Sequence, residues 1–290
     1  MTRTRLLAAL VMAPLAICAV LFLPTPWMAA LSAAAFLVGL WEWLKLTDIE
    51  DPIARGVLLV VNLMLMVALV WASRSNSGGS FVLFKIMVLI GVIWWLLAAL
   101  WLRHYDFASD HNTHARVFKL AAATLSVIPA WCALVLIHAG QIGLGVGQAA
   151  ASQPNGQRWL LLALAIVWAA DSGAYFAGRR FGKTKLSPRI SPNKTVEGLI
   201  GGAIAGMVLA LVAAPFAGAT FKQLPYVAIV AIWTILFSVV GDLFESLLKR
   251  HVGVKDSSHL IPGHGGVLDR IDSILAALPV FALGKLLFGF

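Results

Sequence analysis

The chain has 290 residues, of which 60% are hydrophobic and only 12% charged, and its mean hydropathy is +0.89. A soluble core of this size cannot bury so much apolar surface, so the composition excludes an ordinary soluble domain and predicts a membrane protein with several spans. The formal net charge of +9 does not indicate nucleic-acid binding, because the basic residues stand between apolar segments, where they orient a membrane protein. Cys18 and Cys132 lie inside apolar runs and predict neither a disulfide framework nor a thiol active site.

The first residues, MTRTR, precede an apolar run that ends at Leu23. A secretory signal begins in a similar way, but this run has the length of a spanning helix, beyond the apolar core of about 7–15 residues that is typical of a signal. We therefore expect an uncleaved first helix. Cleavage near Ala33–Ala35 is the alternative.

Apolar segments long enough to span a bilayer, about 17 to 25 residues each, follow one another along the whole chain. They lie near residues 6–23, 27–46, 54–72, 81–102, 117–139, 158–178, 196–214, 224–248 and 268–289. The sequence thus predicts an all-α, polytopic integral membrane protein with about nine transmembrane helices in a single membrane domain. We expect residues 1–140 to form a lipid-facing scaffold and residues 158–290 to form the catalytic region. The segment 140–157 between them, rich in Gly, Ala, Gln and Ser, suggests no chemistry.

The Lys and Arg residues are distributed unevenly between the two sides that these segments define. With the N-terminus placed in the cytoplasm, the outside loops and segment ends hold only Arg74, Lys85, Arg158, Lys222 and Lys285 of the 22 Lys and Arg residues. The other basic residues all lie on the cytoplasmic side. Because cytoplasmic loops are enriched in Lys and Arg, this bias predicts an odd number of helices, a cytoplasmic N-terminus and a C-terminus outside.

The first half of the chain holds few ionisable groups inside its predicted helices, and Glu42 is the exception. An intramembrane carboxylate is by default a functional candidate. Glu42 lies near the inner end of its helix, however, so we expect it to make interfacial or interhelical hydrogen bonds rather than to act in catalysis. Tryptophans near segment ends predict anchors at the membrane interface, namely Trp27, Trp43, Trp71, Trp101 and Trp159.

Polar residues return at Asp171, which lies within a predicted helix and is costly there unless it faces a cavity, a metal or a cation. Six basic residues follow in one loop, and they offer donors for phosphate oxygens or for anionic lipid: Arg179, Arg180, Lys183, Lys185, Arg189 and Lys194. The run GRRFGKT is not a phosphate loop, because it has three residues between its glycines where that motif needs four. Thr195 is placed to cap the next helix, whose first turn carries Glu197, and Lys194 beside that N-terminus is a good anion ligand.

The stretch from Val239 to Ser273 is the most polar part of the second half. On a helix, Asp242, Glu245, Ser246 and Lys249 share one face, and Glu245 with Lys249 has the spacing of a simple surface ion pair. The turn PGHGG that follows has a backbone able to approach a ligand closely. The last helix then carries Asp269, Arg270 and Asp272, whose two carboxylates stand three residues apart and can point into one space.

Carboxylates clustered near fixed cations have a natural use in phosphate chemistry. The acids can hold Mg²⁺ by oxygen ligation while Lys and Arg neutralise phosphate oxygens. The residues themselves therefore predict Mg²⁺-dependent phosphoryl or nucleotidyl transfer at the inner membrane surface, without naming the substrate.

One run of residues in this region identifies a protein family more specifically than composition does. Residues 246–272, SLLKRHVGVKDSSHLIPGHGGVLDRID, resemble the signature of the phosphatidate cytidylyltransferase (CDP-diacylglycerol synthase) family, S-x-x-K-R-x4-K-D-x5-P-x-H-G-G-x2-D-R-x-D. The fixed positions present are Ser246, Lys249, Arg250, Lys255, Asp256, Pro262, His264, Gly265, Gly266, Asp269, Arg270 and Asp272. A second block of that family is similar to the residues from Asp171 to Gly198. The first half of the chain matches only in being helical and apolar.

The resemblance implies the reaction of CTP with phosphatidate to give CDP-diacylglycerol and diphosphate in phospholipid biosynthesis, with Mg²⁺ as cofactor. By analogy with the family, the catalytic residues are Asp242, Lys249, Asp269, Arg270 and Asp272, and Asp242, Asp269 and Asp272 also hold the metal. The substrate-binding residues implied in the same way are Asp171, Lys183, Lys194, Thr195, Glu197, Ser246, Arg250, Lys255, His264, Gly265 and Gly266.

These implications extend to partners and location. We expect the enzyme in a bacterial-type inner (plasma) membrane, with its site open to the cytoplasm for CTP and to the bilayer for phosphatidate and other membrane lipids. Gly198, Gly202 and Gly206 have small-xxx-small spacing, which serves either packing within one chain or a homodimer. The alternatives are a CTP-dependent polyprenol or dolichol kinase and, from another class, a cation-coupled transporter, although the internal repeats typical of transporters are not found.

Overall fold

The structure is a computed structural model that describes residues 2–47, 49, 51–75, 81–109, 112–141, 155–261 and 265–290, with the side chains of residues 2–10, 74 and 75 excepted. Its helices are α1 (Thr2–Phe22), α2 (Thr25–Lys45), α3 (Pro52–Ser75), α4 (Val82–Trp101), α5 (Thr113–His138), α6 (Gly156–Phe181), α7 (Val196–Ala217), α8 (Leu224–His251) and α9 (Leu268–Phe288). A short 3-10 helix, η1 (Phe221–Gln223), precedes α8. Between α6 and α7 lie two short strands, β1 (Lys185–Ser187) and β2 (Ser191–Thr195).

These helices confirm the predicted fold class. Eight of them, from α2 to α9, are long and apolar enough to cross a membrane, and the described part of α1, Val11–Phe22, is a shorter apolar helix. They follow the predicted segments in order, with ends that differ by a few residues. The antiparallel hairpin of β1 and β2, in which Lys185 pairs with Thr195, was not predicted. Its strands are short and polar and lack the apolar alternation by which strands are found in a sequence.

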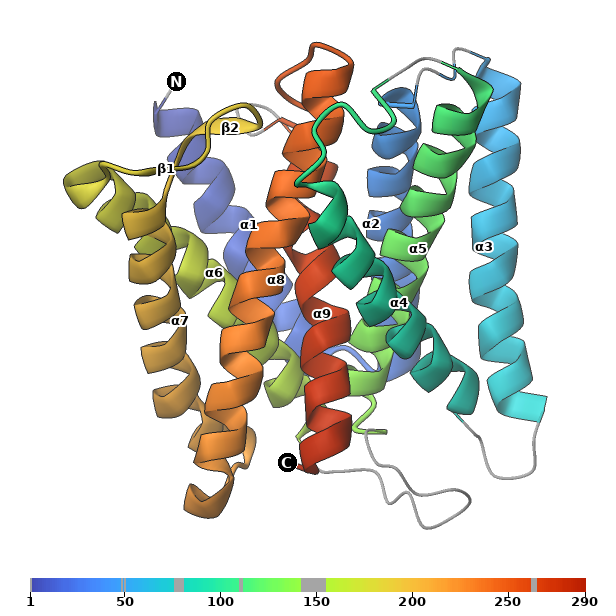
Figure 1. The fold of residues 1–290 in the computed structure, drawn as a ribbon. Coiled ribbons are helices and arrows are strands. Elements are labelled where there is room, and N and C mark those ends of the chain that lie inside the picture. The colour runs from blue at the N-terminus through green and yellow to red at the C-terminus, as the bar shows by residue number, and fades with distance from the viewer. Residues whose placement is uncertain are drawn as a thin grey trace.

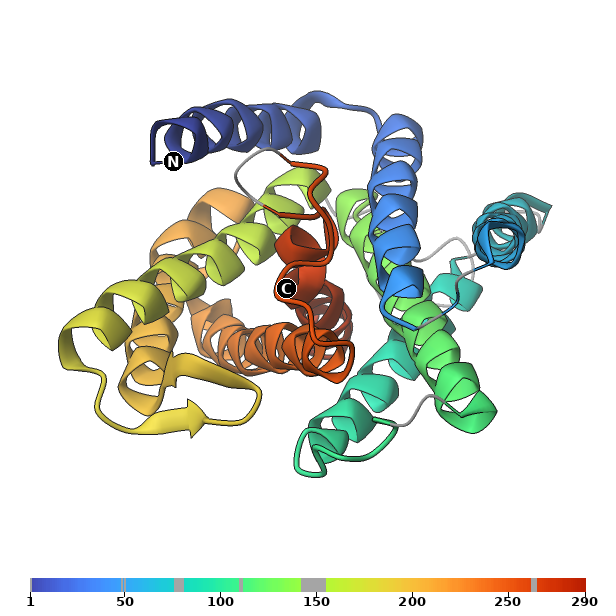
Figure 2. The same ribbon diagram turned by 90° about the horizontal axis from the view of Figure 1, so that it is seen from above.

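The helices form one bundle around a central pair, α8 and α9 (Figures 1 and 2). The tightly packed pair α6 and α7 lies on one side of it, and α2, α4 and α5 lie on the other. Helix α5 is an inner helix, and 78% of its most apolar stretch is buried. Helix α3 stands at the edge of the bundle, and only 17% of its most apolar stretch is buried. The core that supports the central pair is therefore built from both halves of the chain.

Small residues explain how closely α6 and α7 approach each other. A Cβ atom at Gly202 would lie 2.6 Å from the carbonyl oxygen of Ala170, and one at Gly173 would lie 2.5 Å from the Cβ of Ala205. Gly206 instead faces α8, since a Cβ there would lie 2.7 Å from Cδ1 of Ile235. The glycine spacing in α7 thus serves packing within one chain.

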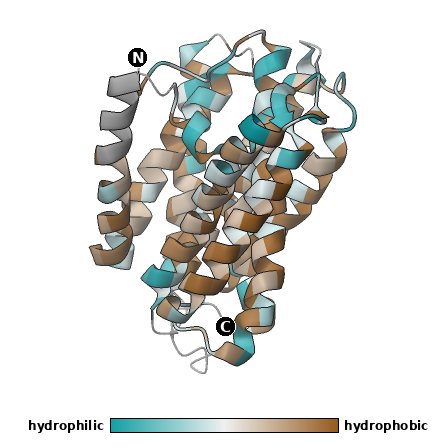
Figure 3. Ribbon diagram, turned by 90° about the vertical axis from the view of Figure 1, so that its left-hand side faces the viewer, coloured by the Kyte–Doolittle hydropathy of each residue, from teal (hydrophilic) through white to brown (hydrophobic). Residues whose placement is uncertain are grey.

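Polar residues gather at the ends of the bundle, and apolar residues fill its middle (Figure 3). The two termini lie at opposite ends of the bundle (Figure 1). The hairpin, the end of α8 and the start of α9 all lie at the end that carries the N-terminus. Which end faces the cytoplasm stays a prediction from the charge distribution.

The prediction for the tryptophans is wrong at three positions. Trp43, Trp101 and Trp159 are only 1%, 5% and 3% exposed and pack inside the bundle. The indole N–H of Trp43 donates to the carbonyl of Lys119 at 3.2 Å, and the ring of Trp101 lies 4.9 Å from that of Phe244. Nearness to a helix end does not say which side of the helix meets its neighbours, and here that side is the core.

Candidate active site

A cavity of about 530 Å³ lies beneath the hairpin, where α6, α7 and α8 meet. Its polar lining comes from α6, the hairpin and α8 and consists of Asp171, Tyr175, Arg179, Ser191, Asn193, Lys194, Thr195 and Asp242. Gly178 and Gly198 line it as well, and a Cβ on Gly198 would lie 3.0 Å from the carbonyl oxygen of Ala174. The cavity therefore brings together residues of the two polar stretches that the sequence keeps about 50 residues apart.

An ion pair crosses this cavity. Nζ of Lys194, on the hairpin, contacts Oδ2 of Asp242, on α8, and both side chains are partly exposed, at 25% and 32%. Asp171 on α6 lies close enough to Asp242 and Lys194 to interact with them electrostatically. Two carboxylates thus share one lysine in an accessible space, an arrangement that leaves room for a cation or for a phosphate bridged by one.

Two residues near the start of α9 extend this group. Asp272 is 8% exposed and interacts electrostatically with both Asp242 and Glu245. Arg270 is exposed and interacts with Asp171. Asp272 therefore stands between the cavity and a second, buried group of charges on α8.

Two side chains at the start of α7 hold the hairpin that carries Lys194. The carboxylate of Glu197 accepts hydrogen bonds from the backbone N–H groups of Lys183 and Thr184, at 3.0 and 3.1 Å. Oγ1 of Thr195 accepts from the N–H of Gly198 at 3.1 Å and caps α7, as the sequence predicts. The side chain of Lys183 itself is exposed and does not line the cavity. Glu197 and Thr195 accordingly position the loop that bears Lys194.

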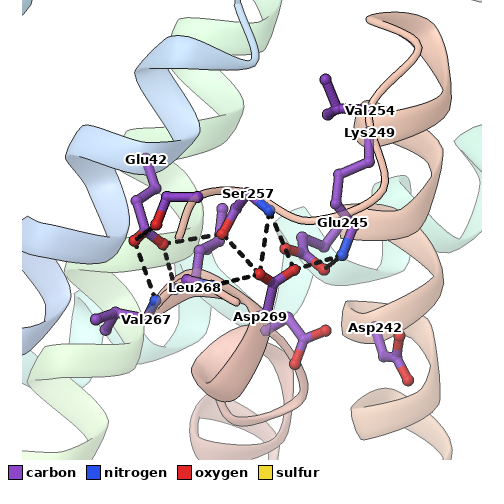
Figure 4. A network of polar contacts seen from close by, with 12 residues as sticks. Glu42, Asp242, Glu245, Lys249, Val254, Ser257, Val267, Leu268 and Asp269 are labelled. Atoms are coloured by element: carbon purple, nitrogen blue, oxygen red, sulfur yellow. Dashed lines mark hydrogen bonds and ion pairs between the residues drawn. The ribbon is translucent and has the colours of Figure 1, made fainter. Parts of the chain in front are cut away.

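The second group of charges is buried. Nζ of Lys249 lies 2.5 Å from Oε2 of Glu245 and 2.7 Å from Oδ1 of Asp269, and the three side chains are at most 10% exposed. The sequence permitted an exposed surface pair of Glu245 and Lys249. The pair exists, but it is buried because α9 and the preceding loop cover that face of α8, and Asp269 adds a second negative charge (Figure 4).

The loop before α9 wraps around the carboxylate of Asp269. Oδ2 accepts from the backbone N–H groups of Gly266 and Ser257, at 2.7 and 3.1 Å, and lies 3.0 Å from the Ser257 hydroxyl. Gly265 has a φ of +82°, and a Cβ there would lie 2.7 Å from Oδ2 of Asp269. A Cβ on Gly266 would collide with Ser257 and with Glu42 of α2. The two glycines thus permit the close approach that the sequence predicts, and the partners they approach are the protein's own side chains.

Other residues of the predicted set lie around these two groups. Arg250 donates from Nε to the carbonyl of Ile190 at 3.2 Å and so ties α8 to the hairpin. Ser246 is half-buried on α8 and Lys255 is exposed in the following loop. His264, together with Pro262, lies outside the described residues.

Sequence reasoning left two residues of this region outside the site. Ser257 lies in a loop and carries no recognisable signal. Glu42 was expected only to make interhelical hydrogen bonds, and it does so, with every partner in the loop and helix start that also hold Asp269 (Figure 4). A carboxylate in an otherwise apolar helix was a signal for a functional role of Glu42. It did not identify the hydrogen-bond partners of Glu42, which are more than 200 residues away in the sequence.

Known proteins are similar to this chain over nearly its whole length. The model of the cytidylyltransferase family matches residues 3–288. The chain belongs to this cytidylyltransferase family. A phosphatidate cytidylyltransferase of Haemophilus influenzae is 38% identical over 291 residues, which cover 97% of this chain and 98% of that protein. One of Pseudomonas aeruginosa is 36% identical over 282 residues, covering 97% and 96%. One of Bacillus subtilis is 47% identical over 128 residues, or 43% of this chain and 46% of that protein.

The extent of the family match includes the first five helices, which the sequence motifs did not reach. Family membership thus assigns cytidylyltransfer chemistry to the chain as a whole.

Proposed function

We propose that this chain is a phosphatidate cytidylyltransferase, which converts CTP and phosphatidate into CDP-diacylglycerol and diphosphate. The observation that carries the proposal is the match over nearly the full length to two relatives that bear this name. The cavity beneath the hairpin supports it, because it combines carboxylates with cationic donors at the end of a membrane-spanning bundle. A nucleotide from solution and a lipid from the bilayer both reach such a position.

The reaction requires little proton transfer. A phosphate oxygen of phosphatidate, already anionic at neutral pH, attacks the α-phosphorus of CTP and forms a new P–O bond. The bond from the α-phosphorus to the oxygen that bridges to the β-phosphorus breaks, and diphosphate leaves with that electron pair. No general base is needed, and the main barrier is the approach of two anions.

Cationic side chains around the cavity reduce the repulsion between the two anionic substrates. Lys194 and Arg179 line it directly, and Arg270 lies near Asp171 at its edge. Lys194 contacts Asp242, and it can turn to a phosphate once another positive charge satisfies that aspartate. Guanidinium and ammonium donors then bind the phosphate oxygens and hold the two substrates at reacting distance.

The donor chemistry of the site fits Mg²⁺. Asp242 interacts through its charge with both Asp171 and Asp272, and the buried Oε1 of Glu245 has no hydrogen-bond partner in the described part of the chain. Carboxylate oxygens are the ligands that Mg²⁺ prefers, and it commonly takes one or two of them together with substrate phosphates and water.

We assign Asp242, Asp269 and Asp272 as the residues that would hold Mg²⁺, with Asp242 the most accessible of the three. A bound ion would supply positive charge for the phosphate oxygens of the diphosphate leaving group. Lys249 remains with Asp269 and Glu245 and balances their charge.

Orientation and location belong to the same proposal. The excess of Lys and Arg at the end that carries the hairpin supports a site open to the cytoplasm of a bacterial inner membrane. Residues 158–290 supply the catalytic side chains of this proposal, and the first helices serve as scaffold.

The test is an assay of the purified protein in detergent or liposomes with CTP, phosphatidate and Mg²⁺. We expect CDP-diacylglycerol and diphosphate from the native protein, loss of product in the presence of a chelator and recovery on addition of Mg²⁺. Asp269→Asn should be severely impaired. No CDP-diacylglycerol from the native protein would reject the proposal, and release of CDP with a phosphorylated lipid alcohol would indicate a CTP-dependent lipid kinase instead.

A further inference from the structure

Glu42 is a buried carboxylate from the half of the chain that lies outside the two motif blocks. It lies in α2, with an exposed fraction of 0%. Gly39, one turn earlier, brings α2 against the start of α9, since a Cβ there would lie 2.7 Å from Cδ1 of Ile271 and 3.9 Å from Cα of Leu268. The carboxylate of Glu42 therefore meets the first turn of α9 directly.

Four donors surround the two oxygens of this carboxylate (Figure 4). Oε1 lies 2.5 Å from the hydroxyl of Ser258 and 3.1 Å from the N–H of Val267. Oε2 lies 2.9 Å from the hydroxyl of Ser257 and 2.7 Å from the N–H of Leu268. The N–H groups at a helix start have no partner within the helix and favour a negative charge. The carboxylate thus has its acceptor positions filled and is not available to a ligand.

Ser257 joins this carboxylate to that of Asp269. Its hydroxyl lies 2.9 Å from Glu42 and 3.0 Å from Asp269, and its single hydrogen can be donated to only one of them at a time. Its backbone N–H donates to Asp269 in either case. Asp269 in turn binds Lys249. A continuous set of contacts therefore runs from α2, through the loop before α9, to the charged face of α8.

We propose that Glu42 is a positioning residue for cytidylyl transfer: it fixes the start of α9 and, through Ser257, sets the carboxylate of Asp269 against Lys249. This inference rests on the proposed function of the site. It also gives the first half of the chain a role in the reaction beyond that of a lipid-facing scaffold. The length and the charge of the side chain both matter, because all four donors are neutral and two of them are backbone N–H groups, of Val267 and Leu268, whose positions the chain fixes.

The experiment compares Glu42→Gln and Glu42→Asp with the native full-length protein in detergent. The glutamine keeps the shape but directs an NH₂ group at donors, and the aspartate keeps the charge but retracts it by about 1.5 Å, one C–C bond. The matched control is Ser32→Ala, because Ser32 is also buried in α2 but bonds only to backbone carbonyls of its own helix, those of Met28 and Ala29.

Two readouts separate positioning from general stability. In Glu42→Gln we expect kcat to fall by about tenfold or more, since a hydrogen-bonded buried charge is lost. The Mg²⁺ concentration for half-maximal rate should rise, while KM for phosphatidate stays within about twofold of the native value. Amide hydrogen exchange in a peptide covering residues 265–272 should accelerate in Glu42→Gln and not in Ser32→Ala. Ser257→Ala should show the same pattern more weakly, and its effect should not add to that of Glu42→Gln.

The outcomes are distinct. Unchanged exchange at residues 265–272 in both Glu42 variants would overturn the proposal. So would faster exchange with an unchanged kcat and an unchanged Mg²⁺ dependence per folded molecule, because the residue would then serve folding alone. A native protein without cytidylyltransferase activity would reject the proposed function, whereas the exchange comparison would still decide whether Glu42 holds this segment.

Discussion

Two groups of charged residues each include side chains of α8, and they differ in exposure and in their bonding. The cavity group, Asp171, Lys194 and Asp242, lines a space of about 530 Å³, and its ion pair is partly exposed. The buried group, Glu245, Lys249 and Asp269, is covered by the loop before α9 and held from α2. Accessible charges can exchange partners at modest cost, and buried ones cannot. The first group is suited to exchange its partners for substrates, and the second to hold the carboxylate of Asp269 in a fixed position between α8 and α9.

The largest effect on stability is expected in the buried group. Lys249→Met leaves Glu245 and Asp269 buried without their cation, and the free energy of unfolding should fall by about 3 to 5 kcal/mol. Denaturant unfolding in mild detergent measures this value, with Lys255→Met as the control, because Lys255 is exposed. An equal, small change in both variants would remove the distinction between the groups.

The cavity group should give the opposite result. In Asp242→Asn we expect the rate of CDP-diacylglycerol formation to fall by about 10²–10³-fold, the usual effect of removing one preorganised electrostatic partner. Its stability should change by less than about 1 kcal/mol, because the ion pair with Lys194 is partly exposed. A large loss of stability with little loss of rate would reverse the roles of the two groups.

The cap of α7 tests how firmly the hairpin must hold Lys194. Thr195→Ala removes the acceptor for the N–H of Gly198 and should lower the free energy of unfolding by about 1 kcal/mol. KM for CTP should rise, since the cap is next to Lys194 in the chain. Thr195→Ser keeps the hydroxyl and should behave as the native protein in both measurements.

The smallest effect on stability and rate is expected at the exposed ion pair between the hairpin and the loop after α4. Arg189 of the hairpin pairs with Asp106 at 3.3 Å, but both side chains are mostly exposed, at 67% and 77%. Asp106→Asn should therefore change stability by at most about 1 kcal/mol and leave the rate unchanged. A marked loss of rate would show that hairpin placement depends on this surface contact as well as on Glu197 and Thr195.

Much of the fold follows from the sequence because a bilayer imposes a simple rule. Each span must be a helix of about 20 apolar residues, and the predicted segments match α1 to α9 in order. The hairpin was missed, since its two strands are polar and very short. Trp43, Trp101 and Trp159 were placed at the interface because their sequence positions, near segment ends, do not report their direction around the helix.

The candidate site was predictable in composition but not in arrangement. The residue types near Asp242, Asp269 and Lys194 indicate phosphate chemistry from the sequence alone. The pairing of Lys194 with Asp242 and of Lys249 with Asp269 joins residues 48 and 20 positions apart, and the contact of Glu42 with Leu268 joins residues 226 apart. No local pattern encodes these contacts, because they depend on how helices pack.

The sequence by itself determined the membrane class, the order of the helices and the chemical types of the site residues, since hydropathy, charge and motif spacing are local properties. The tertiary structure decided which carboxylates face a cavity and which are buried, and it assigned Glu42 to the start of α9. The physical reason is that burial and hydrogen bonding are set by neighbours in space. Acidic residues with the same side-chain chemistry consequently differ in exposure and in bonding, as Asp242 and Asp269 do.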